Sequence, residues 1–139
     1  MVNSYNRKIE KPILESFFRG KVIIITGARQ VGKTTFVESL VSKQNSIRFN
    51  CDNPTDREEL NEKDLERLRD LIGSKEVVFI DEAQKVPSIG QTLKLMVDAF
   101  GEEKQIIATG SSTLNLLDKT SESLTGRKRV WRLYPLSLE

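Results

Sequence analysis

A glycine-rich loop constrains this chain more than any other part of its sequence. Residues 27–34 read Gly-Ala-Arg-Gln-Val-Gly-Lys-Thr, a complete match to the pattern G-x-x-x-x-G-K-[ST]. The backbone N–H groups of such a loop surround an anion, and the helix that follows points its positive end at the same place. We expect Lys33 to reach the terminal phosphates and the Thr34 hydroxyl to bind Mg²⁺. The residues expected to contact the nucleotide are Gly27, Ala28, Arg29, Gln30, Val31, Gly32, Lys33, Thr34 and Thr35.

The sequence on both sides of this loop has the pattern that a phosphate site needs. Residues 21–26 form a short β-branched apolar run, which is typical of a parallel strand covered on both faces. Residues 33–42 carry apolar side chains at helical spacing. A strand, the loop and a helix are therefore predicted in succession.

A second motif supplies two carboxylates. Residues 77–82 read Val-Val-Phe-Ile-Asp-Glu, an apolar strand that runs into Asp81 and Glu82 at the edge where open α/β sheets bind ligands. Asp81 is expected to hold Mg²⁺, directly or through a water. Glu82 is expected to orient and activate the water that attacks the γ-phosphate. The alternative is that the two carboxylates only cap a strand and begin a turn; the loop at 27–34 favours the nucleotide site.

Composition excludes several other kinds of chemistry. The 139 residues, 37% of them hydrophobic, predict one domain over 1–139, with 1–20 as an N-terminal lead-in. With no histidine and one cysteine, zinc sites, Cys-His nucleophiles and disulfides are excluded, and Cys51 is expected to be a small residue at a strand end. The net charge of +2 gives no global attraction to nucleic acid or membrane. Neither a signal peptide nor a membrane span is recognisable, so a cytoplasmic location is expected.

Strands and helices alternate along the chain, which predicts an α/β fold with a parallel sheet and helices on both faces. The expected strands are 21–26, 46–51, 77–80, 105–109 and 129–133. The expected helices are 12–18, 33–42, a charged helical region over 54–72, 88–100 and 113–119.

Four segments together carry a family resemblance. They are Gly-Ala-Arg-Gln-Val-Gly-Lys-Thr-Thr at 27–35, Phe-Ile-Asp-Glu-Ala-Gln at 79–84, Ala-Thr-Gly-Ser-Ser at 108–112, and Leu-Thr-Gly-Arg at 124–127 followed by Tyr-Pro-Leu-Ser at 134–137. In these the chain resembles the prokaryotic AAA-superfamily ATPases that join an N-terminal P-loop core to a C-terminal domain of unknown function. The resemblance implies a P-loop NTPase fold of three layers, α/β/α, with a five-stranded parallel sheet in the order 5-1-4-3-2.

The resemblance also implies roles for two residues. Ser111 would occupy the polar position called sensor 1, in contact with the γ-phosphate or the attacking water; from the residues alone it is equally a turn and a helix N-cap. Arg127 would be an arginine finger that reaches a neighbouring subunit's γ-phosphate. Because residues 126–132 hold four basic side chains and no acidic one, two other interpretations stay open: a solvated edge strand, or a nucleic-acid contact with Trp131 for stacking.

The sequence therefore predicts Mg²⁺-dependent ATP binding and hydrolysis, with Lys33, Glu82, Ser111 and Arg127 as catalytic residues and Thr34 and Asp81 as metal ligands. Alternatives are a nucleotide-dependent switch with little hydrolysis and a DNA-associated ATPase. The sequence ends at Glu139, just after the expected fifth strand, so we do not expect these residues to include the helical lid that the resemblance implies. We expect a lid, and any assembly into a homo-oligomer, to depend on a C-terminal region beyond this chain or on partners.

Overall fold

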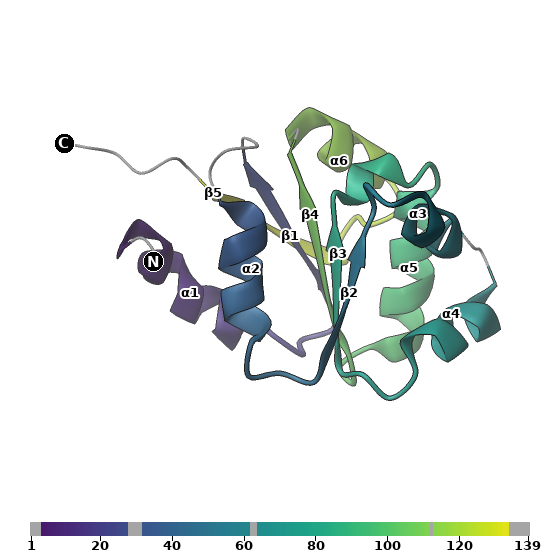
Figure 1. The fold of residues 1–139 in the computed structure, drawn as a ribbon, viewed down its shortest axis with the longest axis horizontal. Coiled ribbons are helices and arrows are strands. Elements are labelled where there is room, and N and C mark those ends of the chain that lie inside the picture. The colour runs from purple at the N-terminus through teal and green to yellow at the C-terminus, as the bar shows by residue number, and fades with distance from the viewer. Residues whose placement is uncertain (1–3, 28–31, 62–63, 112, 134–139) are drawn as a thin grey trace.

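The fold is a parallel sheet with helices on both faces (Figure 1). A computed structural model describes residues 4–27, 32–61, 64–111 and 113–133. The strands are β1 Val22–Gly27, β2 Ser46–Asn50, β3 Val77–Asp81, β4 Gln105–Gly110 and β5 Lys128–Leu133. The helices are α1 Ser4–Glu15, α2 Lys33–Val41, α3 Pro54–Leu60, α4 Leu65–Ile72, the short 3₁₀ helix η1 Ala83–Lys85, α5 Ile89–Phe100 and α6 Thr113–Thr120.

The order of the strands confirms the predicted fold. Neighbouring strands pair in the order β2-β3-β4-β1-β5, which reads 5-1-4-3-2 from the other edge. All four pairings are parallel. Strand β4 therefore lies between β1 and β3, so the residues that follow these three strands meet at the carboxyl edge of the sheet.

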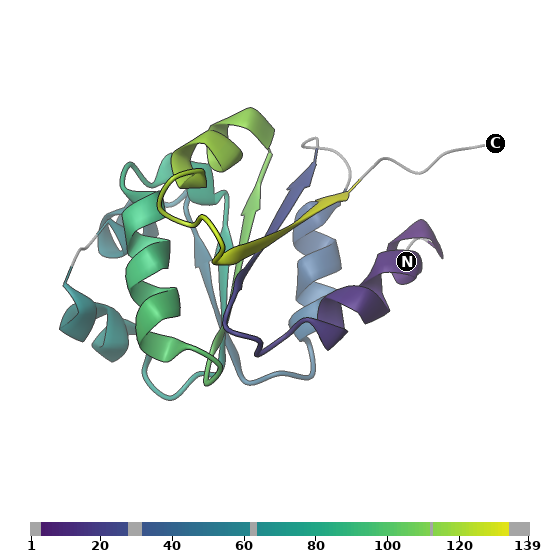
Figure 2. The ribbon, with the colours of Figure 1, turned by 180° about the vertical axis from the view of Figure 1, so that it is seen from behind.

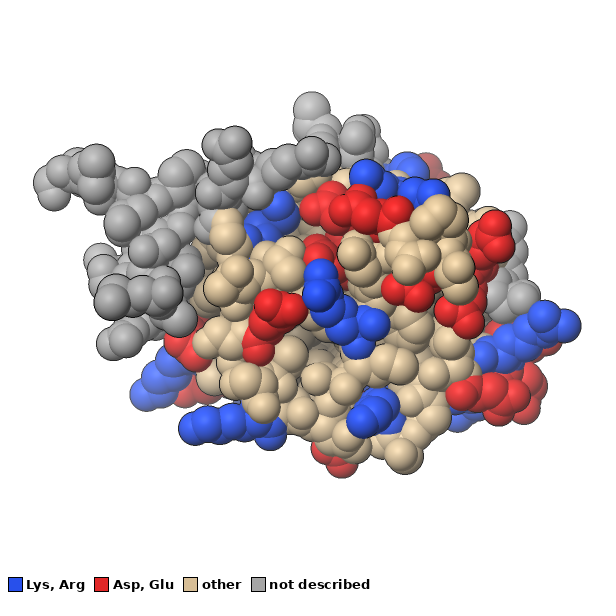
Figure 3. Space-filling model, viewed as in Figure 1, with Lys and Arg blue, Asp and Glu red and all other residues tan. Residues whose placement is uncertain are grey.

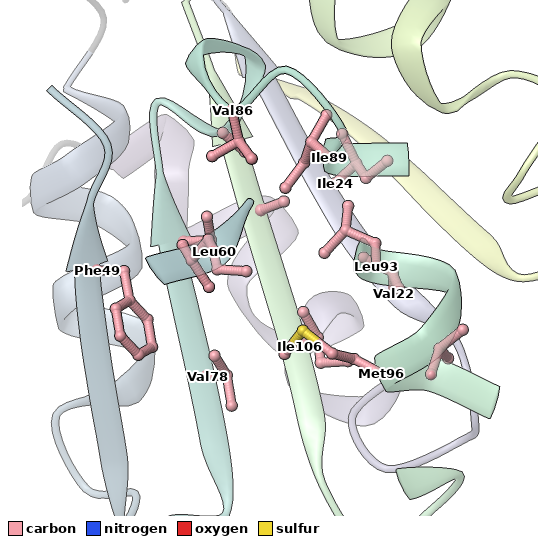
Figure 4. Close-up of a cluster of buried hydrophobic side chains, with 14 of the residues drawn as sticks. Val22, Ile24, Phe49, Leu60, Val78, Val86, Ile89, Leu93, Met96 and Ile106 are labelled. Atoms are coloured by element: carbon pink, nitrogen blue, oxygen red, sulfur yellow. The ribbon is translucent and has the colours of Figure 1, made fainter. Parts of the chain in front are cut away.

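Each face of the sheet carries its own hydrophobic core. Alternate residues of β1 point to opposite faces: Ile23 and Ile25 join a core with α1 and α2, whereas Val22 and Ile24 join a core with α3 to α6. Figures 1 and 2 show the two groups of helices on opposite sides of the strands. Figure 4 shows the second core, in which α5 supplies Ile89, Leu93 and Met96.

Burial differs sharply between central and edge strands. Every residue of β1 is buried, as expected for a strand between two neighbours and two helical layers. Strand β5 pairs only with β1, and its Val130 is 44% exposed. The face of the molecule in Figure 3 carries basic and acidic side chains intermixed, in keeping with the small net charge.

The first helix differs from the prediction. We expected a helix over 12–18 with Pro12 in its first turn, but α1 spans Ser4–Glu15 and contains Pro12 near its end. Ile9 and Ile13, one helical turn apart, both pack into the core beside α2. This packing extends the helix ahead of Pro12, and the backbone then turns through Phe18, whose φ is 60°.

The charged helical region over 54–72 is two helices. Asn53 Oδ1 accepts a hydrogen bond from the Thr55 N–H at 2.9 Å and caps α3. Asp64 Oδ1 accepts one from the Glu66 N–H at 3.0 Å and begins α4 as a second N-cap.

Across residues 4–27, 32–61, 64–111 and 113–133, no helix has the length and apolar character needed to cross a membrane.

Candidate functional site

The loop predicted to bind phosphate joins the central strand β1 to helix α2. Gly27 ends β1, and Gly32, with φ 80° and ψ 34°, stands in a left-handed conformation at the N-cap of α2. Glycine adopts this conformation without the steric cost that other residues have. The predicted contacts Ala28, Arg29, Gln30 and Val31 lie outside the described residues.

Three predicted residues open helix α2 at the carboxyl edge of the sheet. Lys33 is only 4% exposed, Thr34 is half-buried and Thr35 is exposed. All three belong to the first turn of the helix, and the N–H groups and dipole at such a helix end favour an anion. Lys33 adds its own positive charge to that position.

The carboxylate of Asp81 joins four elements of the fold. Asp81 ends β3 and is 3% exposed as a whole residue, and its carboxylate accepts hydrogen bonds on both oxygens. The Thr109 hydroxyl of β4 donates to Oδ1 at 2.7 Å. The Thr34 hydroxyl of α2 and Nη2 of Arg48 on β2 both donate to Oδ2, each at 2.9 Å.

The Thr34–Asp81 contact brings together the two sequence motifs. A hydroxyl and a carboxylate are the hard oxygen ligands that Mg²⁺ takes. In the described part of the chain, no group of three or more acidic, histidine or cysteine side chains could hold a metal ion. This pair fits the usual protein share of a nucleotide-bound Mg²⁺, in which phosphates and water complete the shell.

Glu82, Gln84 and Ser111 form a second polar group beside Asp81. Glu82 has an unusual left-handed backbone, with φ 54° and ψ 46°, between β3 and η1. Its Oε1 accepts from Gln84 Nε2 at 2.8 Å and from Ser111 Oγ at 3.1 Å. The structure therefore places the predicted base and the predicted sensor in direct contact.

Arg127 lies away from this group within the same chain. Its backbone carbonyl accepts from the Val22 N–H at 2.8 Å, which places it at the amino edge of the sheet, where β1 begins. Its Nε donates to Asp98 Oδ1 on α5 at 2.7 Å. The structure brings Lys33, Thr34, Asp81, Glu82 and Ser111 to one edge and leaves Arg127 at the other.

Sequence reasoning assigned no role to three residues that hold the carboxylates. Thr109 and Gln84 both lie in motif segments. A polar side chain near the end of a buried strand, as at Thr109, or two residues after Glu82, as at Gln84, was a usable sign of a contact with these carboxylates. Arg48 gave none, because it lies on β2, 33 positions before Asp81, and only the pairing of β2 with β3 brings the two together.

Cys51 follows β2 and is fully buried near the same edge. Its N–H donates to the Asp81 carbonyl at 3.0 Å. Burial, helped by the nearby negative charges of Asp56 and Asp81, raises the pKa of its thiol to about 12. The side chain is therefore a neutral thiol at ordinary pH, as expected for a small buried residue.

Comparison with known proteins gives the family. The sequence profile of the family described as AAA domain matches residues 19–139, nearly the whole chain. The chain belongs to this family. The uncharacterized protein Rv2008c of Mycobacterium tuberculosis is 32% identical over 120 residues, which are 86% of this chain and 26% of that protein. The chain thus spans about a quarter of the length of this relative.

Solved structures share the fold at low sequence identity. DnaA from Aquifex aeolicus, solved with AMPPCP bound, has a TM-score of 0.63 and 22% identity, covering 96% of this chain and 47% of that one. A chain of the Drosophila ORC bound to DNA has a TM-score of 0.68 and 12% identity, covering 97% and 93%. These likenesses show the fold that this chain shares with those proteins.

Proposed function

We propose that this AAA domain binds ATP with Mg²⁺ at residues 27–35 and hydrolyses it. One observation carries the proposal: the Thr34 hydroxyl donates to the Asp81 carboxylate at 2.9 Å, so the loop motif and the carboxylate motif form one site. Beside it, the amino end of α2 and Lys33 supply the positive charge that a triphosphate needs.

Each polar residue of the site can be assigned a role in hydrolysis. Thr34 and Asp81 would hold Mg²⁺, which neutralises charge on the phosphates when bound. Glu82 takes a proton from a water whose oxygen attacks the γ-phosphorus, while the bond from that phosphorus to the β–γ bridging oxygen breaks and ADP leaves. Ser111, at 3.1 Å from Glu82, is placed to orient the water or the γ-phosphate.

One observation favours the alternative of a nucleotide switch with little hydrolysis. The Glu82 carboxylate already accepts from Gln84 and Ser111, and a base held by two donors is less available to a water. A DNA-associated role has a different support: the Drosophila ORC that shares this fold was solved bound to DNA, and Arg129 and Arg132 are exposed on the edge strand β5.

Removing the Lys33 charge tests the binding half of the proposal. Lys33→Ala should weaken ATP binding at saturating Mg²⁺ by at least about tenfold, or roughly 1.4 kcal/mol, because a charge-assisted phosphate contact is lost. Isothermal titration calorimetry measures the affinity. The matched control is Lys43→Ala, which removes an exposed lysine just beyond α2 and should change nothing. Equal affinity in the Lys33 variant and the parent would refute ATP binding at this loop.

A further inference from the structure

Arg48 makes contacts that the proposed function does not explain. From β2, its Nη2 donates to Asp81 Oδ2 at 2.9 Å and its Nη1 to Glu38 Oε2 of α2 at 3.2 Å. The guanidinium lies 5.7 Å from the centre of the Phe79 ring, and this cation–π contact stabilises its position. One arginine thus bridges two carboxylates of different burial: the Asp81 side chain is 5% exposed and the Glu38 side chain 51%.

The contact with Asp81 compensates a buried charge. A carboxylate out of water is strongly disfavoured unless a cation or several donors offset its charge. Thr34 and Thr109 supply neutral hydroxyls, and Arg48 supplies a full positive charge. Arg48 therefore supplies Asp81 with part of the positive charge that a bound Mg²⁺ would supply.

The same contact also competes with a metal. Thr34 and Arg48 donate to the same oxygen, Oδ2. Each carboxylate oxygen offers about two lone-pair directions, so Oδ2 is fully engaged. An ion that Thr34 and Asp81 hold through Oδ2 has to displace one of these donors. Of its two donors, Arg48 is the one with a second acceptor already in reach, on Glu38.

We propose that Arg48 is a displaceable counter-ion of the magnesium site. It pairs with Asp81 while the site holds no metal, and it shifts fully onto Glu38 when Mg²⁺ and nucleotide bind. In this way Arg48 and Glu38 set the Mg²⁺ concentration that nucleotide binding requires. The inference rests on the proposed function, because it needs a site that binds Mg²⁺ with ATP.

The test is the Mg²⁺ concentration that gives half-maximal binding of a non-hydrolysable ATP analogue, measured by calorimetry over a Mg²⁺ series. Arg48→Met removes the competing charge and keeps an apolar stem over Phe79. It should lower the required Mg²⁺ by about two- to fivefold, the range of a partly exposed ion pair. Glu38→Gln removes the negative charge of the second acceptor and should raise the requirement by a similar factor. In the Arg48→Met background, Glu38→Gln should have little effect, because its partner is gone.

Arg69→Met is the matched control, since Arg69 also lies over a phenylalanine, 5.4 Å from the Phe100 ring centre, on the distant helix α4. It should leave the Mg²⁺ requirement unchanged. An unchanged or higher requirement in Arg48→Met would overturn the inference. If that variant does not fold, Glu38→Gln decides alone, and an unchanged or lower requirement overturns it. If the parent protein fails to bind the analogue at every Mg²⁺ concentration, the proposed function is overturned, and this inference with it. If the parent binds the analogue normally, the variants test this inference apart from the proposed function.

Discussion

Thr109 anchors the Asp81 carboxylate to the neighbouring strand of the sheet. The register Ile80↔Ala108 places Asp81 and Thr109 side by side on β3 and β4, and the hydroxyl donates at 2.7 Å. Both residues are nearly or fully buried. A hydrogen bond to a buried charge is worth more than one between neutral groups, so Thr109 is expected to stabilise both the fold and the position of the carboxylate.

Replacing this hydroxyl gives a test with an internal standard. Thr109→Val should lower the free energy of unfolding by about 1.5 to 3 kcal/mol, because Asp81 loses a donor in a buried site. Thr92→Val is the control: Thr92 is equally buried, but its hydroxyl donates to the neutral carbonyl of Leu60 at 2.8 Å. Urea denaturation followed by circular dichroism measures both variants. A smaller loss for Thr109→Val than for Thr92→Val would contradict the role assigned to this contact.

The residues that touch Asp81 also show what a sequence can reveal about a site. Thr34 and Asp81 were predictable because each belongs to a motif whose spacing is fixed by local backbone geometry. Arg48 was not predictable, since its place beside Asp81 depends on the pairing of β2 with β3 and on the reach of a long side chain. The contact between Glu82 and Ser111 likewise depends on strand order, which the sequence implied only through the family resemblance.

The turn from β3 into η1 packs tightly against the end of β4. Gly110 closes β4, and a Cβ atom there would lie 2.9 Å from Gln84 Oε1 and 3.0 Å from Leu116 Cδ2. The backbone of Gly110 is outside the left-handed region. Glycine is therefore needed here because a side chain would collide with its neighbours, and not because of the backbone conformation. This close approach lets Gln84 reach Glu82 at 2.8 Å, and the Lys119 Nζ of α6 donates to the Gln84 carbonyl at 2.6 Å.

Filling this space should therefore disturb the group around Glu82. Gly110→Ala is expected to destabilise the protein by about 1 to 3 kcal/mol, because the neighbours are packed and must shift. If the overlap with Gln84 dominates, Gln84→Ala should relieve it, and the double variant should be more stable than the sum of the two single effects implies. Thermal or urea unfolding of the four proteins gives this coupling. Strictly additive losses of stability would show that the absence of a side chain at Gly110 is not needed to make room for Gln84.

The helices were less predictable than the strands. The predicted ends of all five strands lie within one residue of the observed ends. The signal is clearest in β1, β3 and β4, whose residues are all buried. In the region 54–72, Leu60, Leu65, Leu68 and Ile72 fit one helical stripe, so the break before α4 was missed although Asp64 is a suitable N-cap. Helix α1 was misplaced because Pro12 looked like a start, whereas core packing of Ile9 and Ile13 decided its extent.

At the level of the whole molecule, Arg127 is the residue whose predicted role needs another subunit. It lies at the edge of the sheet opposite Glu82 and pairs with Asp98. A finger role would require it to exchange this exposed pair for a γ-phosphate of a neighbouring chain. The matched segment is 26% of the relative Rv2008c, so that protein has further sequence outside the match.

In a longer form of the protein that continues beyond Glu139, we predict that ATP turnover per chain rises with protein concentration. Arg127→Ala should abolish this rise with little change in nucleotide affinity, because a finger acts mainly on the transition state. Asp98→Ala is the control: it breaks the same ion pair but keeps the arginine. Turnover that stays flat with concentration, or an equal loss in Asp98→Ala, would leave Arg127 a structural residue just before the edge strand β5.

We propose one site, built from residues 27–35 with Asp81 and Glu82, that binds Mg²⁺ and ATP and hydrolyses the nucleotide. Its most direct test is single-turnover hydrolysis, with protein in excess over ATP at saturating Mg²⁺, compared between the parent and Glu82→Gln. The substitution keeps the shape and removes the basicity, so the rate should fall by about 10² or more while affinity stays near that of the parent. Glu103→Gln, an exposed acid on the loop before β4, should leave the rate unchanged. Hydrolysis by Glu82→Gln as fast as by the parent, or no hydrolysis by the parent itself, would contradict the account.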